Sequence, residues 1–313
     1  MLRPRLIALV GPTAAGKTAT ALALAPELGA EIVSVDSRQV FRGLDVGTAK
    51  PTRLERAAVT HHLLDMVGPQ ELYDAARFAE DGRRAITGIL ARGRTALLCG
   101  GSGLYLRALT AGLCPAPPAD PAVRAAIERA IDERGLEALR RELAADDPEA
   151  VLRIASRDRL RLVRALEVLR LTGRPISAWQ AEHRFADRPW EVATFVLSPP
   201  TGELDERIRR RTAAIFAGGI LEETRAALDA GVSGAASSLQ SIGYREAQLV
   251  LRGEWPLDDA VAAATVATRR YAKRQRTWFR GLADARWLDP VDPLPELRRD
   301  GQRFLEGGGL HAA

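Results

Sequence analysis

The sequence predicts an α/β fold, in which a parallel sheet carrying a phosphate-binding loop (P-loop) forms the core and a mainly helical domain is inserted into it. Three observations support this prediction. A short apolar run is followed at once by a glycine-rich turn and a helix, which is how a buried parallel strand opens a βα unit. Strand and helix patterns then alternate, as in doubly wound sheets. A long helical stretch separates two of the strands, so we expect it to be an insertion.

The first strand is the apolar run at residues 6–10, which ends at Gly11. An alanine-rich segment that begins at Lys17 follows it, and we expect this segment to form a helix that ends near Gly29. Further elements of the sheet domain are expected at residues 31–36 (strand), 75–92 (helix) and 95–101 (strand).

Four prolines within residues 113–121 mark a boundary in the chain. Residues 122–174 have a helical pattern throughout, and the strand expected at residues 192–198 resumes the sheet. A long helix is expected at residues 257–282, whereas the tail from residue 301 onward is expected to be loose. The predicted domains are therefore a P-loop core of residues 1–115 and 190–313, and a helical insertion of residues 116–189.

The charge balance suits a polyanionic partner. Forty-five Lys and Arg residues oppose forty Asp and Glu residues, which gives a net charge of +5 and a pI near 9.7, and nearly all the basic residues are arginine. Guanidinium groups match phosphates well. An arginine-rich codon usage explains the same balance, so the charge alone does not decide the function.

The chain has the features of a cytoplasmic protein. Cys99 and Cys114 are its only cysteines, too few for a disulfide scaffold and without CxxC spacing. The basic start is followed by only five apolar residues, which is typical of a strand and not of a signal peptide. No stretch approaches the roughly 20 apolar residues of a membrane span, so we expect no membrane attachment.

The segment GPTAAGKT fits the motif G-x-x-x-x-G-K-[ST] in full and lies between a strand and a helix. Backbone N–H groups of such a loop and the positive end of the helix dipole hold phosphate oxygens. Lys17 would neutralise these oxygens, and the Thr18 hydroxyl would ligate Mg²⁺. The motif indicates a diphosphate or triphosphate site formed by Gly11, Pro12, Thr13, Ala14, Ala15, Gly16, Lys17 and Thr18.

A P-loop NTPase normally has a second acid, at the end of a later strand, that orients Mg²⁺ and the attacking water. Here the strand at residues 95–101 ends in two glycines. The nearest acid is Asp36, at the carboxyl end of the second strand, where open α/β sheets place their active sites. Asp36 would act either as a general base or only as a cap for the next segment, and the neighbouring P-loop favours the base.

Several further segments accompany these motifs in order. They are SRQVFRGLDVGTAKP after Asp36, HHLLD at residues 61–65, GGSGLYLRAL after the third strand, RALEVLRLTGRP in the insertion and KRQRTWFR at residues 273–280. With the P-loop, this set resembles the bacterial tRNA dimethylallyltransferases over nearly the whole chain, up to about residue 289.

The resemblance implies that a dimethylallyl group is transferred from dimethylallyl diphosphate to the exocyclic amine of the adenosine immediately 3′ of the anticodon in tRNA. It implies tRNA and dimethylallyl diphosphate as partners and Mg²⁺ as cofactor, and we expect a monomer. Asp36 would be the base. Ser102, at a position that is usually Thr in the family, would keep a hydroxyl at the reacting region. Lys17 would hold the diphosphate, together with Arg207 and Arg211.

The same resemblance assigns a set of tRNA contacts. The insertion reads RDRLRLVR where relatives often have an Asn-Asp-Pro-Gln-Arg run, although Asp158 and Arg161 persist. The residues expected to contact tRNA, besides Asp36 and Ser102, are Ser37, Arg38, Gln39, Arg124, Leu160, Arg161, Leu162, Val163, Arg164, Gln240, Ser241, Ile242, Gly243, Tyr244 and Arg245.

Prenyl transfer agrees with the missing second acid. An allylic diphosphate ionises readily, so the enzyme must stabilise the departing charge and supply a base for the amine, but it need not position a water molecule. We also expect the target base to be unstacked and flipped into the site.

Residues 269–280 hold six basic residues and no acidic one, interleaved with Tyr271, Trp278 and Phe279. On a helix these cations would form a face for RNA phosphates, while the aromatic side chains would either pack in the core or stack on bases. His61 and His62 are adjacent and lack the i,i+4 spacing of a helical metal pair, so we expect them to be structural.

Three other functions remain open on sequence grounds. A small-molecule P-loop kinase would also place an acid after the second strand, although it would need neither the insertion nor the basic helix. An isopentenyltransferase acting on free adenine nucleotides would use the same chemistry. A non-catalytic RNA-binding P-loop switch would have no use for a base at Asp36.

Overall fold

A computed structural model describes residues 3–183 and 186–309, and it divides into two compact units. One unit comprises Met1–Thr110 with Pro189–Ala313, and the other is Ala111–Arg188. None of the helices in these described ranges has both the length and the apolar character that a membrane crossing requires.

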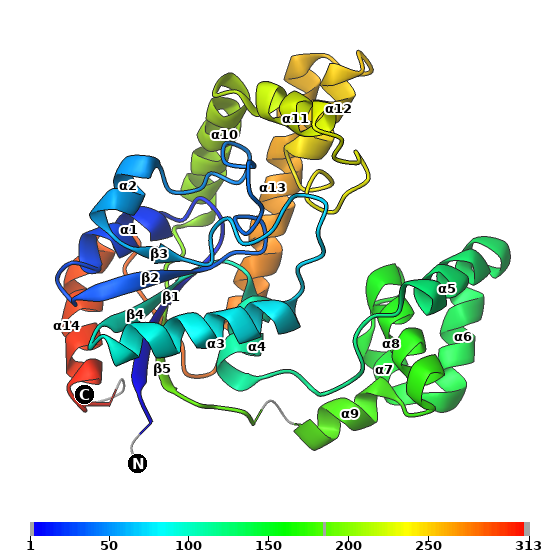
Figure 1. Ribbon diagram of the computed structural model, residues 1–313, viewed down its shortest axis with the longest axis horizontal. Coiled ribbons are helices and arrows are strands. Elements are labelled where there is room, and N and C mark those ends of the chain that lie inside the picture. The colour runs from blue at the N-terminus through cyan, green and yellow to red at the C-terminus, as the bar shows by residue number, and fades with distance from the viewer. Residues whose placement is uncertain (1–2, 184–185, 310–313) are drawn as a thin grey trace. The chain divides into compact units, whose positions relative to one another are not determined.

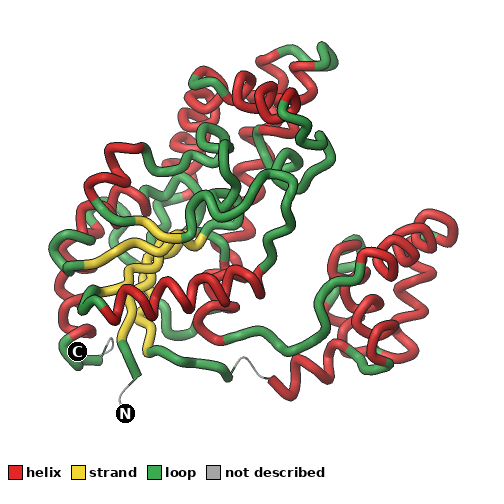
Figure 2. The backbone as a smooth tube through the Cα atoms, viewed as in Figure 1, coloured by secondary structure: helices red, strands yellow, loops and turns green. Residues whose placement is uncertain are grey.

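The first unit is built on a six-stranded parallel sheet with the strand order β3-β2-β4-β1-β5-β6, which confirms the predicted fold class. Figure 2 shows the strands of this sheet in yellow. Its strands are β1 (Arg5–Val10), β2 (Ala30–Val35), β3 (His61–His62), β4 (Thr95–Gly100), β5 (Glu191–Val196) and β6 (Arg286–Trp287). Gly100 is in register with Val10 on one side and Val35 on the other. The loops that follow β1, β2 and β4 therefore leave the sheet side by side.

Helices cover both faces of this sheet (Figure 1). The helices of this unit are α1 (Lys17–Leu24), α2 (Arg53–Ala58), α3 (Ala75–Ala91), α4 (Gly103–Ala111), α10 (Thr201–Ala217), α11 (Ile220–Asp229), α12 (Tyr244–Leu251), α13 (Leu257–Arg280) and α14 (Pro293–Leu305). Side chains alternate between the faces of a strand, so Ile7 and Leu9 share one face. They belong to a core cluster with residues of α1 and α14, whereas α3 packs on the opposite face against β2 and β4.

Two local expectations are wrong. The helix α1 ends at Leu24 and not near Gly29, because Pro26 has no N–H group with which to continue the hydrogen bonds of the helix. The tail is not loose over its first residues, because α14 continues to Leu305 and buries Leu297 and Phe304 against the sheet. Residues 310–313 of that tail lie outside the described residues.

In the described part of the second unit, all the regular elements are helices, and loops connect them. Its helices are α5 (Pro121–Arg134), α6 (Leu136–Asp146), α7 (Pro148–Arg153), α8 (Arg159–Thr172) and α9 (Ile176–His183). Aspartates at positions 120, 147 and 158 accept amide hydrogen bonds at the starts of α5, α7 and α8, and Gly173 ends α8 in the left-handed conformation. The apolar faces of these helices form a core of their own, which includes Ile127, Leu139 and Leu166.

Candidate active site

The loop between β1 and α1 has the backbone that a phosphate-binding loop requires. Gly11 has a φ of +151°, and a Cβ atom there would lie 2.1 Å from the carbonyl oxygen of Leu197. Gly16 is the N-cap residue of α1 and provides no side-chain cap, so the amides of the first helical turn are not satisfied from within the helix. An anion is the acceptor that the positive end of a helix favours.

Lys17 and Arg211 line one cavity of about 380 Å³ together with this loop. Burial lowers the pKa of Lys17 to about 8, although nearby Cys99 and Asp36 act to raise it. Its Nζ donates a hydrogen bond to the carbonyl oxygen of Pro12 at 2.7 Å. Burial also lowers the pKa of Arg211, which Asp36 acts to raise, but a guanidinium remains charged at neutral pH. The cavity therefore presents two cations to an anionic ligand.

Arg207, which the resemblance assigns to the diphosphate, lies beside the loop. Its Nη1 donates to the carbonyl oxygen of Ala15 at 3.1 Å. With Arg210, Arg211 and residues 16–19, it lines a second hollow of about 310 Å³ between α10 and the start of α1. All three arginines come from one helix, which brings their charges to the phosphate-binding loop.

Asp36 follows β2 and lines the same cavity as Lys17. Its Oδ1 accepts hydrogen bonds from the amides of Arg38 (2.7 Å) and Gln39 (3.3 Å). Ser102, after β4, accepts a hydrogen bond from the amide of Ser37 at 3.1 Å. The structure thus brings Asp36, Ser37 and Ser102 together from two neighbouring strand ends.

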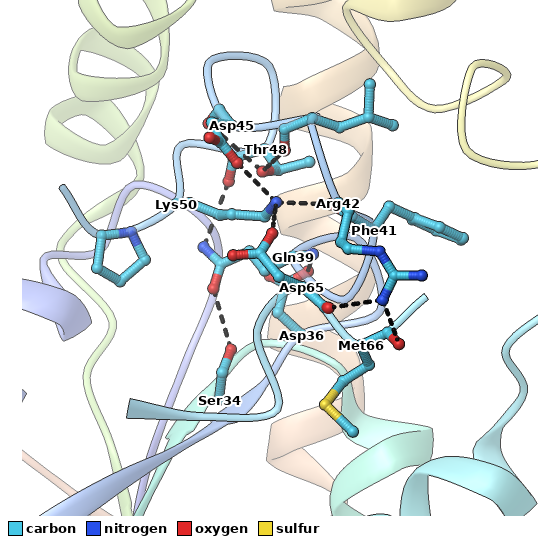
Figure 3. A network of polar contacts seen from close by, with 12 residues as sticks. Ser34, Asp36, Gln39, Phe41, Arg42, Asp45, Thr48, Lys50, Asp65 and Met66 are labelled. Atoms are coloured by element: carbon cyan, nitrogen blue, oxygen red, sulfur yellow. Dashed lines mark hydrogen bonds and ion pairs between the residues drawn. The ribbon is translucent and has the colours of Figure 1, made fainter. Parts of the chain in front are cut away.

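The loop after Asp36 is held by a polar network around a buried lysine, which the sequence analysis missed (Figure 3). The side chain of Lys50 has no exposed surface, and its Nζ donates to the Phe41 carbonyl oxygen (2.5 Å) and to the carboxylates of Asp45 (2.7 Å) and Asp65 (2.6 Å). Gln39 Nε2 donates to the carbonyl oxygens at 48 and 49, at 3.4 and 3.2 Å. These bonds fold residues 36–50 back on themselves and fix the backbone that carries Asp36.

Gln275, on α13, is a second residue that the sequence analysis missed. Its side chain is 7% exposed, and its Oε1 accepts a hydrogen bond from the amide of Thr13 at 2.8 Å. Its Nε2 donates to the carbonyl oxygen of Gly101 at 2.9 Å. One amide side chain therefore connects the phosphate-binding loop to the loop that carries Ser102.

The aromatic and the basic side chains of α13 lie in different surroundings. Phe279 is fully buried, Trp278 stacks against Arg107 with the guanidinium carbon 4.4 Å from the ring centroid, and Tyr271 lines the cavity. Burial and the charge of Asp36 raise the pKa of Tyr271 to about 12, although nearby Ser102 acts to lower it. The exposed cations of this helix are Arg269, Arg270, Lys273, Arg274 and Arg280.

The segment before α12 reaches the same cavity, which Gln240, Ser241, Ile242 and Gly243 line. The two residues that follow do not face it. Tyr244 is fully buried and Arg245 pairs with Glu246 at 2.6 Å. The structure thus places four of the six predicted tRNA contacts of this segment at the cavity.

The predicted tRNA contacts of the second unit are mixed in exposure. Leu160 is 80% exposed, and Arg161 is exposed beside it. Leu162 and Val163 are 2% exposed and pack in the core of that unit. The remaining two, Arg124 and Arg164, both bind the fully buried carboxylate of Glu167, at 3.1 and 2.8 Å.

The histidines at positions 61 and 62 form β3. His62 Nε2 lies 2.6 Å from the carboxylate of Glu31, which also pairs with Arg92. The place of both histidines in the sheet is consistent with a structural role.

Comparison with known proteins gives a consistent family assignment. The family model described as IPP transferase matches residues 39–282. The chain is 50% identical over 302 residues to the tRNA dimethylallyltransferase of Anaeromyxobacter dehalogenans, which covers 96% of this chain and 97% of that relative. It is 46% identical over 287 residues to the corresponding protein of Geobacter metallireducens, with 92% and 93% covered.

Solved structures agree with this assignment. The tRNA isopentenylpyrophosphate transferase of Bacillus halodurans superimposes with a TM-score of 0.71 at 35% identity, covering 97% of this chain and 96% of that one. A eukaryotic dimethylallyltransferase acting on tRNA shares the fold, with a TM-score of 0.83 at 22% identity. The resemblance found in the sequence is confirmed, and the chain belongs to the IPP transferase family.

Proposed function

We propose that this enzyme transfers a dimethylallyl group from dimethylallyl diphosphate to the exocyclic amine of the adenosine immediately 3′ of the anticodon in tRNA. Membership of the IPP transferase family favours prenyl transfer to tRNA over the kinase and the other functions that the sequence left open. The observation that carries the proposal is one cavity that is lined both by the cations Lys17 and Arg211 beside the glycine loop and by Asp36.

The part of the cavity beside the glycine loop suits the leaving group. The amides of the glycine loop, Lys17 and Arg211 would bind the diphosphate oxygens and stabilise the charge that develops when the C–O bond breaks. Arg207 and Arg210 line the adjoining hollow and add positive charge to it.

The residues present fit a magnesium ion that is held mainly by the diphosphate. No cluster of three or more His, Cys, Asp or Glu residues suited to a metal occurs in the described ranges. Mg²⁺ commonly uses one or two protein oxygens together with substrate phosphates and water. The exposed Thr18 hydroxyl at the cavity would be such an oxygen. Bound there, the ion would supply charge neutralisation to the diphosphate.

The part of the cavity around Asp36 suits the acceptor. The amine nitrogen would attack the first carbon of the dimethylallyl group, the bond from this carbon to the diphosphate oxygen would break, and the diphosphate would leave with the electron pair. Asp36 would take the proton from the amine through Oδ2, since Oδ1 already accepts two backbone hydrogen bonds. Tyr271 lines the same cavity, and Ser102 accepts a hydrogen bond from the amide of Ser37, which also lines it, so both hydroxyls would contact the flipped base.

Apolar side chains also line this cavity. Ile208 and Ala264 are 1% exposed and Phe216 is 6% exposed, and they meet at the cavity with Ile215 and Ile242. These side chains would enclose the dimethylallyl tail and keep water away from the ionising carbon. Residues 240–243 and the exposed cations of α13 would contact tRNA, as would Leu160 and Arg161 of the second unit.

The test is a direct transfer assay. The protein is incubated with dimethylallyl diphosphate and Mg²⁺, and with either unmodified tRNA or adenosine monophosphate as the acceptor, and the nucleosides are then analysed by mass. We expect isopentenyladenosine from tRNA alone. Product only from the free nucleotide would transfer the assignment to the nucleotide-prenylating enzymes, and rapid ATP hydrolysis without any prenyl product would refute it.

A further inference from the structure

Glu223, on α11, binds three successive backbone amides of the loop that follows Asp36. Its Oε2 accepts hydrogen bonds from the amides of Asp45 (2.6 Å) and Val46 (2.9 Å), and its Oε1 accepts one from the amide of Gly47 (3.1 Å). Consecutive N–H groups that converge on one anion form a nest, which is a strong way to hold a turn in one conformation. The partners are 176 to 178 positions apart in the sequence, so this contact is purely tertiary.

The same carboxylate contacts a second segment. The hydroxyl of Tyr244 donates to Glu223 Oε1 at 2.5 Å, and the Tyr244 side chain is fully buried. Burial and the Glu223 charge raise the pKa of Tyr244, so the phenol keeps its proton. Its ring packs against Gly47, where a Cβ atom would lie 2.4 Å from a ring carbon. Tyr244 directly follows residues 240–243, which line the cavity.

The turn held by Glu223 is also connected to Asp36, through the side chain of Gln39. The carbonyl oxygens of residues 48 and 49, just after the turn, accept hydrogen bonds from the side chain of Gln39. The amide of Gln39 in turn donates to Asp36 Oδ1. Gln39 is further fixed by Ser34, whose hydroxyl donates to its Oε1 at 3.0 Å (Figure 3). Each step is a direct hydrogen bond or a single peptide link.

We infer that Glu223 is a positioning residue for the acceptor side of the reaction. It fixes the loop that carries Asp36 against residues 240–243, so that the Asp36 carboxylate lies at the correct distance from the acceptor amine. The inference rests on the proposed function. Glu223 does not line the cavity, and its contacts are with the 45–47 turn and Tyr244, not with the phosphate-binding loop. Its loss should therefore impair the tRNA-dependent step and leave diphosphate binding intact.

The first test variant is Glu223→Gln, which keeps the size of the side chain but turns an NH₂ group toward N–H or O–H donors. Misplacing a reacting group by about 1 Å costs ~10²-fold in rate, so we expect kcat/KM for tRNA to fall by about that factor. Calorimetry with inorganic pyrophosphate and Mg²⁺ should give an unchanged Kd. The matched control is Glu222→Gln on the same helix, where the residue is exposed, and it should behave as wild type.

A second variant keeps the inference testable if Glu223→Gln does not fold. Tyr244→Phe removes one hydroxyl and keeps the ring against Gly47, so it should fold and lose a smaller part of kcat/KM for tRNA. A folded Glu223→Gln enzyme with wild-type kcat/KM for tRNA would overturn the inference, and so would an equal loss of pyrophosphate affinity. If the wild type itself gave no isopentenyladenosine, the proposed function would fail instead, so the two failures are distinguishable.

Discussion

Replacing Asp36 by asparagine would separate its two possible roles. In the structure Oδ1 accepts both amide hydrogen bonds of the turn, and Oδ2 accepts none from the described part of the chain. The asparagine oxygen would take the place of Oδ1, and the NH₂ group would take the place of Oδ2. Asparagine caps a turn about as well as aspartate, so the free energy of unfolding should change by no more than about 0.5 kcal/mol.

The catalytic effect of the same change should be large. Loss of a general base costs about 10²- to 10⁴-fold, which is about 2.7 to 5.4 kcal/mol of transition-state stabilisation. The assay is a single turnover with saturating dimethylallyl diphosphate, Mg²⁺ and unmodified tRNA. Asp36 acts to raise the pKa of Lys17, so the rates are compared at two pH values below 8, where a defect caused only by Lys17 deprotonation would shrink as the pH falls.

Two results would refute the base assignment. One is a single-turnover rate for Asp36→Asn that equals the wild-type rate, which would mean that the carboxylate only caps the turn. The other is a defect that extra Mg²⁺ removes, which would mean that Asp36 acts through the metal ion.

Three further results are expected. The affinity for inorganic pyrophosphate, measured by calorimetry, should be full below about pH 8 and should fall above it, because Lys17 loses its proton near this pH in the free enzyme. The same measurement on Lys17→Met gives the pH dependence that comes from pyrophosphate itself. Lys50→Met should lower the free energy of unfolding by about 1–3 kcal/mol in urea titrations, because the Phe41 carbonyl oxygen loses its buried donor. Removing the exposed charges of Arg270 and Lys273 together should reduce the salt slope of tRNA binding by about one to two units, whereas an unchanged slope would place this face of α13 away from the RNA.

The parts of the site that the sequence predicted are those encoded by neighbouring residues. The phosphate-binding loop and its lysine lie within eight consecutive positions, and each residue type is required by local backbone geometry or by charge. Asp36 was predictable because the carboxyl ends of parallel strands meet at one edge of the sheet. The register of β1, β2 and β4 places it at the same cavity as Lys17.

The parts that the sequence did not reveal depend on contacts between distant residues. Lys50 looks like a surface lysine in the sequence. Only the folded loop shows that its side chain is buried and that three oxygen atoms accept its hydrogen bonds. Gln275 stands in a basic run without any pattern that indicates a bond to a loop near the amino terminus. The end of α1 differs from the prediction because the alanine-rich pattern continues past Pro26, whose missing N–H group ends the helix.

The link made by Gln275 also has a consequence for how the protein is synthesised. Its two hydrogen-bond partners precede it by 262 and 174 positions, so the phosphate-binding loop is translated first and its brace almost last. Domains form as units during synthesis from the amino terminus, and a nascent chain that stops before α13 has β1, β2 and β4 but no group to hold the amide of Thr13. Nearly the whole polypeptide must therefore leave the ribosome before Gln275 can hold the loop that contains Thr13, and a chain that terminates before α13 lacks this contact.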